Sequence, residues 1–114
     1  MKKALIVVLG MVCLVVMQNC SGGKKAAKVP PVSYEKDVVP IIQASCTPCH
    51  FPPDGKKQAL NTYDSVKAHI DAVLFRVKLP KEDAKFMPFK SKKPALTVDQ
   101  IAVLEKWQKQ NMHK

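Results

Sequence analysis

Two cysteines and a histidine within five residues constrain this chain more than any other feature: Cys46-Thr47-Pro48-Cys49-His50. The chain has four cysteines in 114 residues, but Cys13 and Cys20 lie within or directly after an apolar N-terminal run. Only Cys46 and Cys49 then remain for the folded part. Two cysteines three positions apart cannot cross-link distant parts of a fold, so the sequence does not describe a disulfide scaffold.

The spacing of this motif is the one through which a c-type haem is attached. The two thiols would add across the two vinyl groups of the porphyrin, and the two intervening residues let both sulfurs reach one edge of the ring. His50 would then fall beneath the iron and offer an imidazole nitrogen. Such a histidine usually has its other ring nitrogen hydrogen-bonded, and the carbonyls of Pro52 and Pro53 are the candidates. The motif predicts one covalently bound haem c.

Two other sites use cysteines at this spacing. A thiol–disulfide centre would suit Cys-Thr-Pro-Cys, but such a centre normally starts a helix after a strand, and no such pattern surrounds it here. A zinc site would need a second pair of ligands at regular spacing, and only His69 and His113 are available.

The first twenty residues have the layout of a secretory signal. Lys2 and Lys3 give a positive start, and an almost unbroken apolar run follows from Ala4 to Met17. The run is short for a membrane span, with an uncleaved helical anchor as the alternative. Cys20 resembles the processing site of bacterial lipoproteins, where it would be lipidated; ordinary signal cleavage nearby is the other interpretation. We expect an exported protein, periplasmic or anchored by lipidated Cys20 and facing the periplasm.

Charge and composition indicate a basic protein with a short tether followed by one domain. After residue 20, 17 Lys and Arg stand against 9 Asp and Glu, a net charge of +8. Such a surface favours acidic partners or anionic lipid, and export argues against nucleic acid. Residues 21–32 are rich in Gly, Lys, Ala and Pro and are typical of a flexible tether. A single domain is predicted over 33–114.

Helical periodicity fills that domain, so an all-α class is predicted. A first helix is expected from Tyr34 to about Ala44, capped by Ser33, with Pro40 expected to kink it. A second should start after Asn61 or Thr62 and end by Pro80. Its apolar face would consist of Tyr63, Val66, Ile70, Val73, Leu74 and Val77. A third should follow Thr97, with Gln100 at the capping-box spacing. Its predicted face is Val98, Ile101, Leu104, Trp107 or Gln108, and Met112.

The predicted sixth ligand of the iron is Met87, 37 positions after His50. Pro88 restricts Met87 to an extended conformation, which places it in a loop from which its sulfur can reach the iron. Phe86 and Phe89 would close an apolar shell around it. The alternatives are that Met87 only fills space, that His69 is the ligand, or that the position is open.

Four stretches in this order resemble the small single-haem bacterial cytochromes c of class I. They are 34–50 (Tyr-x-x-Asp-Val-x-Pro-Ile-Ile before Cys-x-x-Cys-His), 60–66 (Leu-Asn-Thr-Tyr-Asp-Ser-Val), Met87-Pro88, and 96–107 (Leu-Thr-x-x-Gln-Ile-x-x-Leu-x-x-Trp). Two departures stand out: Phe89 replaces a second Pro after Met-Pro, and Gln110-Asn111 stands where the family often has Gly.

The resemblance implies a class I cytochrome c-like fold, in which three main helices surround one haem and the first and last helices cross. It implies a carrier of single electrons rather than an enzyme, with Cys46, Cys49, His50 and Met87 binding the cofactor. A haem enzyme such as a peroxidase, a gas sensor with a labile sixth position, and a module serving a larger protein are the alternatives. Arg76 is a candidate partner for a haem propionate. Five lysines are candidates for docking an acidic redox partner: Lys81, Lys85, Lys90, Lys92 and Lys93.

Overall fold

A computed structural model describes residue 23 and residues 27–114; the predicted signal 1–20, which includes Cys20, and residues 21, 22 and 24–26 of the predicted tether lie outside the described part. In chain order the elements are the π-helical segment η2 (Tyr34–Val38), α2 (Val39–Cys46), α3 (Tyr63–Val77), the 3-10 turn η3 (Phe89–Ser91) and α4 (Val98–Lys109). No strand occurs among the described residues, and the all-α prediction is confirmed for them.

The first predicted helix changes its hydrogen-bonding pattern just before Pro40. Ser33 caps it, and its hydroxyl accepts from the N–H of Lys36 at 3.2 Å. The N–H of Val39 donates to the carbonyl of Tyr34, five residues earlier. A regular α-helix begins at Val39, so Pro40 lies in its first turn, where a missing N–H costs little. The hydrogen-bonding pattern thus changes directly before Pro40, where the sequence predicts a disturbance of the helix.

The other two helices begin at the predicted caps. The Thr62 hydroxyl accepts from the N–H of Ser65 at 3.2 Å, and the Ser65 hydroxyl accepts from the N–H of Thr62 at 3.1 Å. The same reciprocal pair joins Thr97 and Gln100, at 3.2 and 2.9 Å. Each pair satisfies two N–H groups that the first helical turn leaves unpaired.

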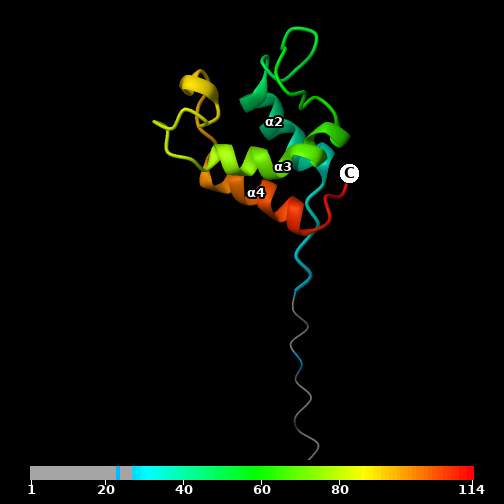
Figure 1. Ribbon diagram of the computed structural model, residues 1–114. Helices are drawn as coiled ribbons and strands as arrows, with labels where there is room; N and C mark the ends of the chain where they lie inside the picture. The colour runs from blue at the N-terminus through cyan, green and yellow to red at the C-terminus, as the bar shows by residue number, and fades with distance from the viewer. Residues whose placement is uncertain (1–22, 24–26) are drawn as a thin grey trace, which may run out of the picture.

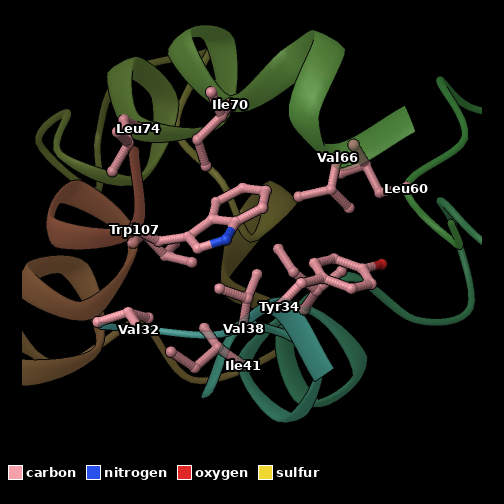
Figure 2. Close-up of a cluster of buried hydrophobic side chains, with 11 residues drawn as sticks. Val32, Tyr34, Val38, Ile41, Leu60, Val66, Ile70, Leu74 and Trp107 are labelled. Atoms are coloured by element: carbon pink, nitrogen blue, oxygen red, sulfur yellow. The ribbon is translucent and has the colours of Figure 1, made fainter. Parts of the chain in front are cut away.

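Helices α3 and α4 run side by side in opposite directions, and η2 packs against α4 (Figure 1). Their contact surfaces form one apolar core, part of which Figure 2 shows: Val32, Tyr34, Val38, Ile41, Ile42, Leu60, Val66, Ile70, Leu74, Leu104 and Trp107. Leu104 and Trp107 are fully buried. Trp107, not Gln108, therefore continues the apolar face of α4. The assignment of Val98 to that face is wrong, because at the first position of the helix it is 83% exposed.

The end of the chain folds back over the start of the domain. The carbonyl of His113 accepts from the indole Nε1–H of Trp107 at 2.7 Å and from the N–H of Tyr34 at 3.0 Å. The hydroxyl of Tyr63 donates to the carbonyl of Met112 at 2.8 Å. These bonds surround three aromatic rings, with centroids 5.3 Å apart for Tyr34 and Tyr63 and 5.7 Å for Tyr34 and Trp107. The tail and the aromatic rings thus join both ends of the folded part.

Candidate functional site

Cys46 is the last residue of α2, and Cys49 and His50 follow in the turn that ends it. The N–H of His50 donates to the carbonyl of Cys46 at 3.1 Å, and that of Phe51 to the carbonyl of Pro48 at 3.0 Å. Both thiols are free, with Cys46 half-buried and Cys49 exposed. The structure therefore gathers the three motif residues into one hydrogen-bonded turn.

The ring of His50 is oriented by a main-chain carbonyl. Its Nδ1 lies 2.6 Å from the carbonyl oxygen of Gln58. A carbonyl can only accept, so the proton of the neutral ring is on Nδ1 and the lone pair is on Nε2. Pro52 and Pro53 were the predicted partners, and that prediction is wrong: the chain continues past them before it turns back beneath the ring.

The loop between Phe51 and Leu60 is held tightly against the motif. The N–H of Lys57 donates to the carbonyl of Cys49 at 3.1 Å, and that of Leu60 to the carbonyl of His50 at 2.9 Å. Gly55 is buried, and a Cβ there would collide with the carbonyl oxygens of Pro48 and Cys49. Only glycine lets the loop pass this closely, and this passage brings Gln58 to His50.

The Cys46 thiol has the wrong environment for thiol–disulfide chemistry. Burial raises its pKa to about 11. It also ends a helix, where the helix dipole disfavours a thiolate, whereas reactive cysteines have lowered pKa values. A neutral, sheltered thiol does not suit that alternative. Among residues 27–114 no group of three or more His, Cys, Asp or Glu is arranged to hold a metal ion, so the zinc alternative gains no support there.

Met87 is positioned by α3, not by the Cys46–His50 turn. Its N–H donates to the carbonyl of Arg76 in the last turn of α3 at 3.3 Å. Its side chain is half-buried between the buried Phe86 and Pro88. Phe86 is buried, whereas Phe89 is 47% exposed, so the expectation that both rings close an apolar shell around Met87 is not met for Phe89. In Figure 1 the loop that carries Met87 lies on the same side of the α3–α4 pair as the end of α2.

The remaining predicted residues are spread over the surface. His69 is half-buried on α3, and the His113 side chain is exposed. Arg76 is half-buried and forms no ion pair within the described part of the chain, where the one ion pair joins Lys78 and Glu105. Lys81, Lys85, Lys90 and Lys92 are exposed and Lys93 is half-buried.

These residues fit the chemistry of a covalently attached haem. Two free thiols three positions apart would supply the thioether links, and the Nε2 of His50 would supply an axial ligand. Sequence reasoning missed Gly55 and Gln58. A glycine six residues after the second cysteine was the available signal, since glycine often marks a close approach of two main chains.

Comparisons with known proteins give no relative: no protein-family model, no curated protein and no solved structure matches the chain. Within the described residues, no helix has both the length and the apolar character needed to cross a membrane.

Proposed function

We propose that this chain is an exported class I c-type cytochrome that carries single electrons through one covalent haem. The observation that supports this most is the geometry of the motif. Cys46 and Cys49 keep free thiols in one turn, and His50 has its Nδ1 on a carbonyl 2.6 Å away. When bound, haem would supply an iron that alternates between its ferrous and ferric states.

Each residue of the proposed site has a distinct task. The sulfurs of Cys46 and Cys49 would hold the porphyrin at one edge. His50 would bind the iron through Nε2, and its bond to Gln58 would fix the ring and raise its basicity. The thioether of Met87 would occupy the sixth position, and His/Met ligation raises the reduction potential of haem iron. A saturated iron leaves no position for substrate, which is why we propose a carrier and not an enzyme.

The basic surface suggests the kind of partner. Lys81, Lys85, Lys90 and Lys92 are exposed in the segment that flanks Met87. Lysines around the exposed edge of a haem would steer the protein to an acidic face on a reductase or oxidase. Membrane attachment through a lipidated Cys20 would hold the carrier close to such partners.

Carbon monoxide tests the proposed ligation in the reduced protein. A haem with both axial positions filled by His50 and Met87 should resist this ligand, and the oxidised protein should show a charge-transfer band from methionine sulfur to ferric iron. Rapid binding of carbon monoxide, without that band, would favour the alternative of a haem enzyme or gas sensor with an open or labile sixth position.

A further inference from the structure

A hollow of about 300 Å³ lies beside η2 and the start of α3, apart from the proposed electron-transfer site. None of Cys46, Cys49, His50 or Met87 lines it. Apolar side chains of three segments contribute to its wall: Val39, Ile42, Phe51 and Leu60. An apolar wall of this kind suits an aliphatic or aromatic body.

Tyr34 lines this hollow, and its hydroxyl has no hydrogen-bond partner among residues 27–114. Tyr34 lines the hollow and is only 8% exposed. Among the described residues, every fully buried side-chain oxygen or nitrogen has a hydrogen-bond partner. The Tyr34 hydroxyl has none among them, so its oxygen is not fully buried and belongs to the small exposed part of the side chain. Figure 2 shows the oxygen pointing away from Trp107. A phenol oxygen held in this way can accept a hydrogen bond from a ligand.

Two of the three charged residues that line the hollow are acidic, although the chain as a whole is basic. Glu35 and Asp64 both line it, and both side chains are exposed. Neither carboxylate forms an ion pair with any residue of the described part. Their two negative charges outnumber the one positive charge of Lys114 in the lining, so the local charge balance favours a cation.

The protein already places an ammonium group at this rim. Lys114 lines the hollow, and its Nζ lies 5.7 Å from the centroid of the Tyr63 ring. This distance is within the range of a cation–π contact. The Nζ of Lys67 lies at a similar 5.5 Å from the same centroid, but Lys67 does not line the hollow.

We infer that this hollow binds a primary alkylammonium group, with Tyr34, Glu35 and Asp64 as its polar contacts. The ammonium would donate to the phenol oxygen and the carboxylates, and its carbon chain would cover Val39, Ile42 and Leu60. Lys114 would compete with the ligand for the face of Tyr63. Phe51 and Leu60 belong both to the hollow and to the ends of the loop beside the motif, but none of the proposed haem-binding residues contacts the ligand, so binding does not depend on the proposed electron transfer.

The probe is n-butylammonium, titrated into the full folded protein and followed by ¹H–¹⁵N NMR. We expect saturable shifts of the amides around the hollow. Tetramethylammonium, which has no N–H, should bind more weakly, and neutral n-butanol more weakly still. Two further probes distinguish the source of the ammonium group. Tighter binding of N-acetyl-lysine methylamide would identify a lysine of another protein, and tighter binding of 1,5-diaminopentane would identify a free amine.

Four variants make the inference falsifiable. Tyr34→Phe keeps the ring and should weaken binding by about 3- to 10-fold, the effect of one hydrogen bond. Glu35→Gln combined with Asp64→Asn should weaken it further. Lys114→Gln should strengthen binding by about 2- to 5-fold, since it removes a competing cation–π contact. Lys109→Gln removes the same charge at an exposed residue that neither lines the hollow nor lies over Tyr63, and it is the matched control. Unchanged helical circular dichroism shows that each variant is folded. Equal binding of n-butanol, or equal effects of Lys114→Gln and Lys109→Gln, would overturn the inference.

Discussion

The Nδ1 of His50 lies 2.6 Å from the carbonyl oxygen of Gln58, eight residues along the chain. This contact assigns the ring proton to Nδ1 and leaves Nε2 free. It depends on a loop that passes too close to Pro48 and Cys49 for any side chain at Gly55. The orientation of the proposed iron ligand is therefore built into the main chain of residues 51–60.

Gly55→Ala should disturb this loop. Its new methyl group would meet two carbonyl oxygens, so the main chain must move. We expect a loss of about 1–3 kcal/mol in the free energy of unfolding, the usual range for overpacking. Urea denaturation measures it. Gly23→Ala is the matched control, because nothing lies within 4 Å of a Cβ at that position. Equal stability of the two variants would show that the loop can accommodate a side chain at residue 55 and would contradict the prediction.

Met87→Ala should open the sixth coordination position. The charge-transfer band should disappear, the reduced protein should gain carbon monoxide binding, and the reduction potential should fall because the soft thioether favours the ferrous state. Met112→Ala is the control, since Met112 is also half-buried but lies in the tail that follows α4. If Met87→Ala keeps the band, another residue is the ligand, and His69→Ala becomes the next variant to test.

The lysines near Met87 should control docking to an acidic partner. Lys90, Lys92 and Lys93 changed together to Gln should slow stopped-flow electron transfer at low ionic strength by about tenfold or more, the lower range of electrostatic steering. The same charge change at the exposed Lys36, Lys56 and Lys57 should have a smaller effect. A rate indifferent to ionic strength, or equal slowing in both triple variants, would rule out a localised docking surface.

The ion pair between Lys78 and Glu105 should give a pH-dependent contribution to stability. Its atoms lie 2.8 Å apart. The hydrogen bond and the charge of Lys78 lower the pKa of Glu105 in the folded state. The contribution is therefore present above the ordinary carboxyl pKa and is lost as the pH falls through the lowered value. A double-mutant cycle with Lys78→Gln and Glu105→Gln should show coupling near neutral pH and none at about pH 2. Coupling that persists in acid would contradict this assignment.

Much of the fold follows from local sequence rules. The caps at Ser33, Thr62 and Thr97 were predictable because their side chains satisfy N–H groups only a few residues away. Val98 was misplaced because periodicity alone does not say where the buried face begins. The predicted domain start at residue 33 also excluded one residue that packs with the domain. Val32 is buried, and its N–H donates to the Gln110 side chain at 2.8 Å.

The parts that sequence reasoning missed depend on contacts between distant segments. Two of them follow no local periodicity: the π-helical segment before Pro40, and the His113 carbonyl that accepts from both Tyr34 and Trp107. Asn111 has a φ of 64°, which is left-handed, a conformation that asparagine tolerates better than most residues. Gln58 could not be identified because its role belongs to its carbonyl, which every residue has.

The mass of the denatured, purified protein tests the central claim most directly. The chain would be produced with an export signal in a host that attaches c-type haem. The account predicts a mass increased by one haem, which persists after denaturation and is absent when Cys46→Ser and Cys49→Ser are combined. An unmodified mass, with both cysteines open to alkylation, would contradict it.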